Sequence, residues 1–312
     1  MITRKILTLL LLAATALPAT AQPTQAIIDP EKKYKEAKDF FVQGQYALAY
    51  PLLKELKLQY PDNTATDHAY LSEDVSYFYI VCELKLQQPI AEQEARHFIE
   101  VVTNEPRRQL LSYHLAHYYF LKDEYSKAIT YFERAGIDNL ENEDIANAKF
   151  ERAYCYFNLQ RYADAKPLFN EIAQVDGHPY QVPANYYYGF ICYQDKEYNE
   201  ALRAFKLAAT HPAYEAVVPY YIAQIYYFQG KKDEALRYGE SVLGKYSNIQ
   251  YQQELKLLMG QLYFERKDFK KARPLLEDYV ATAPRVTKEV MYELSYCYYD
   301  ENNLAKAIEG FK

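Results

Sequence analysis

The sequence is poor in glycine and has no tryptophan. Only 9 of its 312 residues are glycine, roughly 3% against an ordinary share of about 7%, so there is little material for tight hairpins or glycine-rich phosphate loops. Positive charge is also not in excess, because 36 Lys and Arg stand against 42 Asp and Glu and the net charge is −6. Binding to nucleic acid requires clustered cations that neutralise phosphates, so we expect no nucleic-acid partner.

Common catalytic motifs are absent as well. The chain contains no GxGxxG, GxxxxGK[ST], HExxH or GxSxG pattern. His114 and His117 are three residues apart and could supply two metal ligands from one helix face, but no third ligand follows nearby in the sequence. We therefore interpret them as a stacked or hydrogen-bonded pair at a helix surface. The sequence predicts no catalytic residue, no metal site and no cofactor, and hence a protein that is not an enzyme.

What the chain does contain is apolar and aromatic material. Apolar residues make up 50% and charged residues 25% of the chain, which is the composition of a folded protein. The unusual number is 35 tyrosines beside 15 phenylalanines, more than one average domain requires. With so little glycine for turns, this composition predicts a helical protein in which a repeated feature uses tyrosine.

The first segment has the parts of a secretory signal peptide. Arg4 and Lys5 precede an apolar run over residues 6–17, and residues 19–21 read Ala-Thr-Ala, a small-x-small cleavage site. We expect a signal peptide over residues 1–21, a linker over 22–30, and a mature chain that is exported to the periplasm or cell envelope without a membrane span. A retained anchor is the weaker alternative, because the apolar run of about 12 residues is shorter than the ~20 that a spanning helix needs.

The cysteines are spread widely along the chain. They are Cys82, Cys155, Cys192 and Cys297, and each lies inside an apolar helical pattern. No CxxC pair occurs, so neither a redox pair nor a zinc knuckle is indicated. Small disulfide scaffolds need their bridges because they lack a core, whereas this chain has ample core material. We expect four free, buried thiols.

A sequence pattern repeats along the chain. An aromatic residue followed three positions later by alanine begins at Tyr46 and Ala49, and successive alanines lie 46, 33, 37, 36, 34, 37 and 35 residues apart. Twelve residues before the alanine stands a small residue, except for Glu83, and four residues after it stands a bulky apolar one, except for Gly239. The small residues are Ala37, Ala116, Ala153, Gly189, Ala223, Gly260 and Ser295, and the bulky ones are Leu53, Ile99, Phe132, Phe169, Phe205, Leu276 and Phe311.

This pattern resembles the tetratricopeptide repeat family, whose unit is a pair of antiparallel helices. In that family position 8 is small, position 11 aromatic, position 20 alanine, position 24 large and apolar, and position 32 often proline, as at Pro61 and Pro284 here. The resemblance covers residues 31–312 as eight units, the eighth incomplete, and implies an all-α solenoid that forms a superhelix with a concave groove. Position 11 is tyrosine at Tyr119, Tyr156, Tyr226, Tyr263 and Tyr298.

Hydrophobic periodicity agrees with this fold. Residues 186–193 and 220–228 are apolar nearly all round, which requires burial between neighbouring helices. Residues 199–209 instead show apolar residues at intervals of three and four with charges between them, as in a helix with one exposed face. We expect the first helix of each unit, helix A, to be buried and the second, helix B, to face outward.

The family resemblance also implies where a ligand binds. Ligands of the family are usually held by positions 5, 9 and 12 of helix A, which here form an aromatic stripe, and position 9 points most directly into the groove. The alternative is that these rings only fill space between helices, each burying on the order of 150–250 Å². From the third unit on, position 5 is Tyr113, Phe150, Tyr186, Tyr220, Leu257 and Tyr292; position 9 is His117, Tyr154, Phe190, Gln224, Gln261 and Tyr296; and position 12 is Phe120, Phe157, Tyr193, Tyr227, Phe264 and Tyr299.

These features predict a non-enzymatic scaffold of the bacterial cell envelope that binds a peptide or partner protein in the groove. Tyrosine suits this role because it gives a large contact area at low entropic cost. The alternative is a glycan-binding envelope protein on the same scaffold, although the absence of tryptophan weighs against it. The sequence ends at Lys312 with Tyr292, Tyr299 and Phe311 in its last unit. Since solenoids need a polar cap, we expect further repeats, a second domain or an oligomer at this end.

Overall fold

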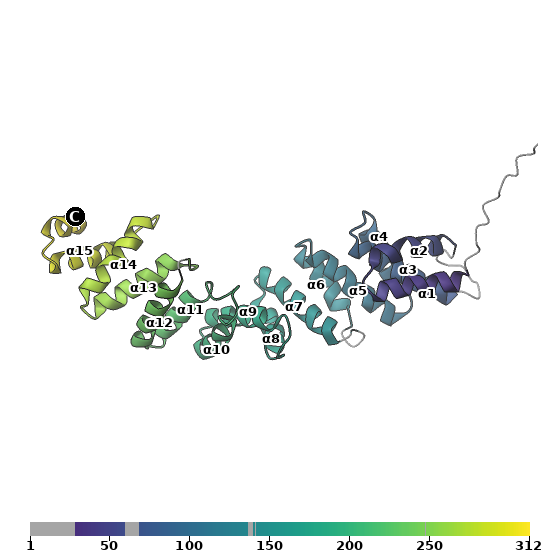
Figure 1. The fold of residues 1–312 in the computed structure, drawn as a ribbon, viewed down its shortest axis with the longest axis horizontal. Coiled ribbons are helices and arrows are strands. Elements are labelled where there is room, and N and C mark those ends of the chain that lie inside the picture. The colour runs from purple at the N-terminus through teal and green to yellow at the C-terminus, as the bar shows by residue number, and fades with distance from the viewer. Residues whose placement is uncertain (1–28, 60–68, 137–139, 141, 247) are drawn as a thin grey trace, which may run out of the picture. The chain divides into compact units, whose positions relative to one another are not determined.

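The structure is a computed structural model that describes residues 29–59, 69–136, 140, 142–246 and 248–312. The predicted signal peptide and nearly all of the predicted linker lie outside these residues. Across the described ranges the chain forms sixteen α-helices and no β-strand (Figure 1), as the sequence predicts. The helices alternate between helix A and helix B of successive units.

The bounds of the helices follow the predicted repeat. The A helices are α1 (Pro30–Val42), α3 (Ala69–Lys85), α5 (Glu105–Phe120), α7 (Asn142–Asn158), α9 (Gln181–Gln194), α11 (Pro219–Phe228), α13 (Gln252–Glu265) and α15 (Lys288–Asp300). The B helices are α2 (Tyr46–Gln59), α4 (Ala91–Val101), α6 (Tyr125–Arg134), α8 (Tyr162–Ala173), α10 (Tyr198–Ala208), α12 (Lys232–Lys245), α14 (Phe269–Thr282) and α16 (Leu304–Phe311).

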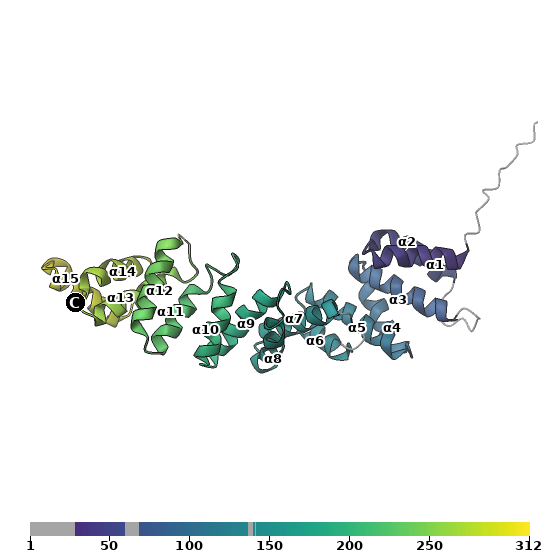
Figure 2. The same cartoon turned by 60° about the horizontal axis from the view of Figure 1, so that its bottom comes forward.

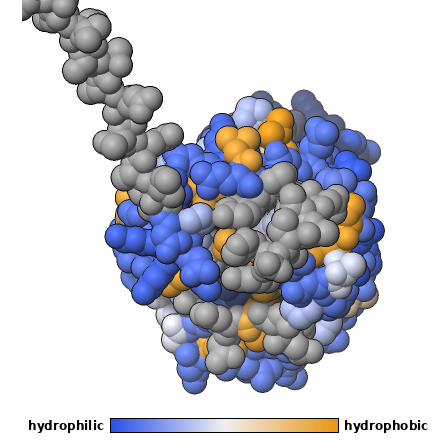
Figure 3. All heavy atoms as spheres, turned by 90° about the vertical axis from the view of Figure 1, so that its right-hand side faces the viewer, coloured by the Kyte–Doolittle hydropathy of each residue, from blue (hydrophilic) through white to orange (hydrophobic). Residues whose placement is uncertain are grey.

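The chain divides into two compact parts, Met1–Cys82 and Glu83–Lys312, with the division inside α3. In the first part α1 and α2 form an antiparallel pair. Asp29 begins α1 by accepting a hydrogen bond from the backbone N–H of Glu31 at 3.1 Å. Tyr34 of α1 donates to Asp74 of α3 at 2.9 Å. On the face shown in Figure 3 the coloured side chains are mostly hydrophilic, with separate hydrophobic areas.

The second part, Glu83–Lys312, is a stack of helix pairs in chain order, as Figures 1 and 2 both show. The small residue at position 8 lets two helices cross closely. A methyl group added to Gly189 would lie 3.1 Å from the ring of Phe205, and one added to Gly260 would lie 2.9 Å from Leu276. Both contacts join position 8 to position 24, so the small and bulky positions of the pattern interlock as predicted.

The turns between helix A and helix B explain how the chain manages with little glycine. In seven units the same position has a left-handed backbone with φ between 58° and 72°. Glycine occupies it only at Gly44 and Gly230. Elsewhere Asp, Asn, Gln or Lys takes this conformation, at a cost of about 1–2 kcal/mol that the fixed turn must offset. These residues are Asp123, Gln160, Lys196, Lys267 and Asn302.

Burial follows the expected division between the two kinds of helix. Residues 181–193 of the A helix α9 are all buried or half-buried, whereas the B helix α10 buries one stripe, which includes Ala201, Ala204 and Phe205. The cysteines lie on A helices: Cys155, Cys192 and Cys297 are free and buried, and Cys82 is also buried. The prediction of buried thiols is confirmed for these positions.

Candidate functional site

The tyrosines at position 11 join neighbouring repeats. Tyr119 donates a hydrogen bond to Glu92 at 2.7 Å, Tyr156 to Glu133 at 2.8 Å and Tyr298 to Glu277 at 2.5 Å, and each acceptor lies on helix B of the preceding unit. Tyr263 donates to Glu240 in the same way. A lysine or arginine lies over each ring, with distances to the ring centroid of 4.5 to 5.0 Å: Lys127, Arg161, Lys271 and Lys306.

These contacts give position 11 a structural role. Burial and then the bond to Glu240 raise the pKa of Tyr263 to about 12, so its hydroxyl remains a donor at neutral pH. Ring, carboxylate and cation come from three successive helices or, for Arg161, from the residue that begins α8, so each group fixes one helix against another. Part of the large tyrosine content therefore stabilises the stack of repeats.

The predicted groove residues of α7 and α9 form a packed aromatic cluster with residues that the sequence pattern did not single out. Tyr187 is its centre: its ring centroid lies 5.4 Å from Tyr154 and 4.9 Å from Phe157. Tyr187 also stacks on Phe169, at 5.2 Å with an interplanar angle of 19°. Phe157 lies 5.5 Å from Phe190. Rings from three helices thus fill the space between them.

The next unit repeats this arrangement. Tyr221 of α11 stacks on Phe205 at 5.4 Å with the same 19° angle, and lies 6.0 Å from Phe190 and 5.4 Å from Tyr193. Tyr187 and Tyr221 both occupy position 6, one residue after the predicted groove position 5. We call Phe150, Tyr154, Phe157, Phe169, Tyr187, Phe190, Phe205 and Tyr221 the ring cluster. The signal in the sequence was a tyrosine at position 6 after a phenylalanine at position 24 of the preceding unit.

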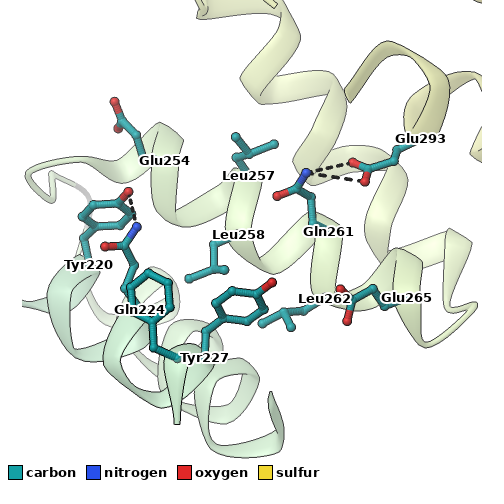
Figure 4. A pocket seen from close by; sticks show the side chains of 11 residues that line it. Tyr220, Gln224, Tyr227, Glu254, Leu257, Leu258, Gln261, Leu262, Glu265 and Glu293 are labelled. Atoms are coloured by element: carbon teal, nitrogen blue, oxygen red, sulfur yellow. Dashed lines mark hydrogen bonds between the residues drawn. The ribbon is translucent and has the colours of Figure 1, made fainter. Parts of the chain in front are cut away.

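A pocket of about 320 Å³ lies between α11, α13 and α15, and Leu258 lines it at position 6, where the ring cluster has tyrosine (Figure 4). Position 24 of the preceding unit is Gly239 here and position 6 is Leu258. A methyl group added to Gly239 would collide with the sulfur of Met259, so Met259 occupies the space beside this glycine. We call this cavity the α11–α15 pocket.

Five of the predicted groove residues line this pocket. Tyr220, Gln224 and Tyr227 come from α11, and Leu257 and Gln261, at positions 5 and 9 of the next unit, come from α13. The pattern did not single out the remaining lining residues, which are Phe228, Glu254, Leu258, Leu262, Glu265 and Glu293. The carboxylates were not recognised because the family positions 5, 9 and 12 do not include them.

The polar groups of the pocket are held by specific bonds. The amide nitrogen of Gln224 donates to the hydroxyl of Tyr220 at 2.5 Å, and the hydroxyl of Tyr193 donates to the amide oxygen of Gln224. Gln261 donates to Glu293 at 3.1 Å. These bonds fix the orientation of both glutamines, since each amide has a partner on a neighbouring helix.

The carboxylates lie at separate edges of an apolar floor that includes Leu257 and Leu258 (Figure 4). Glu265 forms an ion pair with Lys232 at 2.5 Å. Glu254 is exposed in the first turn of α13. Burial raises the pKa of Glu293, the bond from Gln261 opposes this shift, and the nearby charges of Glu265 and Glu289 add to it. The described lining residues include no lysine or arginine.

The remaining predicted groove residues lie on either side of the ring cluster and the pocket. Phe120 lies 5.8 Å from Tyr154, and Tyr113 donates to Asp144 of α7 at 3.2 Å. Tyr186 stacks on Tyr214 at 4.9 Å. In the last unit the ring of Tyr296 lies 5.7 Å from Phe264, whereas Tyr292 is exposed. The structure brings the predicted residues together in neighbouring groups rather than around one cavity.

The interpretation of the two histidines as a surface pair is wrong. His117 contacts Glu151 of α7, with 2.8 Å between its Nδ1 atom and the carboxylate, and Glu151 is buried. The Nδ1 atom of His114 is shielded from solvent. Burial, with smaller contributions from Lys85 and His117, lowers the pKa of His114 to about 3, so its ring is neutral at ordinary pH. Helix packing therefore gives different surroundings to two histidines that their spacing in the sequence had suggested as a pair.

Neither a metal centre nor a membrane helix is found in the part of the chain that the structure describes. Within these residues no three or more His, Cys, Asp or Glu side chains are grouped so as to hold a metal ion. The same residues contain no helix with the length and apolar character needed to cross a bilayer.

Comparisons with known proteins follow the repeat. A family model described as Tetratricopeptide repeat matches residues 125–181 and 257–311, and a second model with this description matches residues 111–135. No curated protein matches the chain. The repeats of this family typically form scaffolds that bind other proteins and are not catalytic.

Similar solved structures include a tetratricopeptide repeat protein from Parabacteroides merdae, with 18% identity and a TM-score of 0.43 over 86% of this chain and 98% of the other. The apo form of RapI has 14% identity and a TM-score of 0.45 over 90% of this chain and 95% of its own. PilF of Pseudomonas aeruginosa has 13% identity and a TM-score of 0.42 over 87% of this chain and 97% of its own.

Proposed function

Because the chain belongs to the tetratricopeptide repeat family, we propose that it is a non-enzymatic scaffold of the bacterial cell envelope that holds a partner protein at the α11–α15 pocket. The observation that carries this proposal is the pocket itself. It opens on three successive A helices, at positions where the family usually contacts its ligands, and it joins an apolar floor to fixed polar groups. Its volume is at the lower end of ligand pockets, about 300–1,000 Å³, which suits a few side chains of a partner.

The export part of the proposal rests on residues 1–21, with their basic start, apolar run and small-x-small site. Mass spectrometry of the exported protein should find an N-terminus at Gln22 or within a residue or two of it. A mature protein that retains Met1 would contradict cleavage and remove the support for an envelope location.

The binding part is tested by filling the pocket. Gln261→Phe places at position 9 the residue that Phe190 supplies in the ring cluster. We expect this variant to fold and to lose partners that the wild-type chain captures from an envelope extract, as measured by quantitative mass spectrometry. Gln93→Phe, at an exposed position on α4, is the control for non-specific binding by an added aromatic ring. If Gln261→Phe captures the same partners as wild type, the pocket is not the binding site.

A further inference from the structure

The α11–α15 pocket has an uneven charge that points to the chemistry of its occupant. Three carboxylates line it, and Glu265 is neutralised by Lys232 at 2.5 Å. Across the described ranges, no lysine or arginine lies within ion-pair distance of Glu254 or Glu293. The pocket therefore presents two carboxylates without a protein cation beside an apolar floor.

The chain itself shows which chemistry satisfies such a combination. Between repeats, Lys271 lies 5.0 Å from the ring centroid of Tyr263 and 3.2 Å from Glu240. Lys306 lies 4.9 Å from the ring of Tyr298 and 3.8 Å from Glu277. In both places tyrosine, glutamate and an amino group form one contact, in which the aliphatic stem covers apolar surface and the charge meets the carboxylate.

The pocket has the tyrosines and the carboxylates of this contact but no cation of its own. Tyr220 and Tyr227 lie on the α11 side, and Glu254 adds to the raised pKa of Tyr220, so ring and carboxylate are near one another. Figure 4 shows Leu257 between Glu254 and Glu293, with Leu258 below it. An apolar floor between two acidic edges complements a side chain with an apolar stem and a positive end.

Resting on the proposed function, we infer that the partner enters the α11–α15 pocket with a basic, partly apolar segment. One lysine or arginine of this segment faces Glu254, a second faces Glu293, and a hydrophobic residue between them lies on Leu257, Leu258 and Tyr227. Charge complementarity selects this occupant: an acidic segment would bring like charges together, and a purely apolar one would leave the buried side of Glu293 without a cation.

The test uses short fluorescein-labelled peptides of lysine, leucine and alanine, with matched peptides in which glutamine or glutamate replaces lysine. Fluorescence anisotropy with the mature chain should show binding in the order lysine, glutamine, glutamate. For the lysine peptide, Glu254→Gln together with Glu293→Gln should reduce affinity about fivefold to tenfold, because partly exposed ion pairs contribute modestly. After Glu293→Gln the new amide oxygen can still accept the hydrogen bond from Gln261, so the variant should fold, and its melting temperature checks this.

The matched control neutralises two exposed carboxylates that do not line the pocket, Glu100→Gln and Glu309→Gln, and should leave the affinity unchanged. Equal loss in both double variants, or equal affinity for all three peptides, would overturn the inference. Displacement of the lysine peptide by free spermidine at the same concentration would assign the site to a small cation and overturn it as well.

Failure of this inference is separable from failure of the proposed function. A partner that is lost on Gln261→Phe but binds Glu254→Gln/Glu293→Gln as tightly as wild type would keep the pocket as the binding site and exclude a basic segment. A partner that still binds Gln261→Phe would exclude the pocket itself.

Discussion

The ring cluster of α7, α9 and α11 and the α11–α15 pocket are built from the same repeat, yet one is filled and the other is open. In the ring cluster Tyr187 and Tyr221 each stack on a phenylalanine of the preceding helix B. Beside the pocket the corresponding residues are Leu258, which lines the cavity, and Gly239, which lies against Met259. The two segments thus differ at positions 6 and 24 of the same repeat.

This difference shows that a high aromatic content in helix A does not by itself produce a binding site. An aromatic stripe along helix A predicts a groove only if the rings have no other rings to pack on. Where the following unit has tyrosine at position 6, as at Tyr187, the rings at positions 9 and 12 contact other rings of the protein. Tyr154 contacts Tyr187, and Phe157 contacts Phe190. Where position 9 is Gln224 or Gln261, space remains. The polar positions of the stripe, rather than the most aromatic ones, mark the cavity.

The largest expected effect comes from removing rings at position 9. Tyr154→Ala together with Phe190→Ala should lower the free energy of unfolding by roughly 4–6 kcal/mol, because each half-buried ring leaves a void among its neighbours. Gln224→Ala together with Gln261→Ala, at the same position in the next two units, should cost clearly less, about 1–2 kcal/mol, since each loses hydrogen bonds but little packing. Denaturant unfolding of both double variants checks this.

The glutamine double variant should lose more partner capture than the aromatic double variant, although it loses less stability. If the Tyr154 and Phe190 variant keeps its stability and loses the partner, these rings form the binding surface, as the sequence predicted, and the cluster is not a packing unit. If the glutamine variant loses more stability than the aromatic one, the distinction between filled and open segments is wrong.

The fold was accessible from the sequence because its determinants are local and repeated. Alanine at position 20, the small residue at position 8 and the bulky residue at position 24 recur with nearly constant spacing, and the helix pairs follow from them. The pocket was less accessible, since its lining combines residues of three helices from successive units. His114 and Glu293 were missed for the same reason: their surroundings come from neighbouring units rather than from their own sequence.

Position 6 offers a third variant of the comparison in the third unit, where it is His114. Its pKa is lowered to about 3 by burial, below the ordinary value of 6.5 for histidine. The unfolded chain therefore binds a proton that the folded chain does not bind, and stability falls as the pH decreases from 6.5 towards 3. The loss between pH 7 and pH 5 should be about 2 kcal/mol.

Unfolding experiments at pH 7 and pH 5 measure this loss, and His114→Gln should flatten the dependence. Lys85 and His117 lie near His114 and oppose its protonation. A dependence that is unchanged in His114→Gln but disappears in His117→Gln would assign the titration to the contact with Glu151 instead.

A smaller effect tests the packing at Gly239 directly. Gly239→Leu restores a bulky residue at position 24, where a first side-chain carbon would already collide with the sulfur of Met259. We expect a net loss of about 1–2 kcal/mol from overpacking, and recovery of most of it when Met259→Ala is added. A double-mutant cycle from denaturant unfolding measures the coupling; additive effects would show that Met259 does not occupy the space at Gly239.

The smallest expected effect concerns a feature that the two segments share. If the segments differ through positions 6, 9 and 24 alone, then position 11 should behave alike in both. Tyr156→Phe removes the hydrogen bond to Glu133 in the filled segment, and Tyr263→Phe removes the bond to Glu240 beside the pocket. Each variant keeps its ring and the cation over it, so each should lose only about 0.5–1.5 kcal/mol.

Tyr226 supplies the control for this last prediction, because it occupies position 11 but packs differently. Its ring lies under Lys206, at 5.5 Å, and 6.1 Å from the ring of Tyr238. Lys206 stands at the position of the preceding helix B where Glu133, Glu240 and Glu277 accept from the tyrosines of other units. Tyr226→Phe should therefore change the unfolding free energy by a few tenths of a kcal/mol at most. A loss at Tyr263 well above that at Tyr156 would show that the pocket weakens the junctions around it, and the two segments would then differ in their junctions as well as in their cavities.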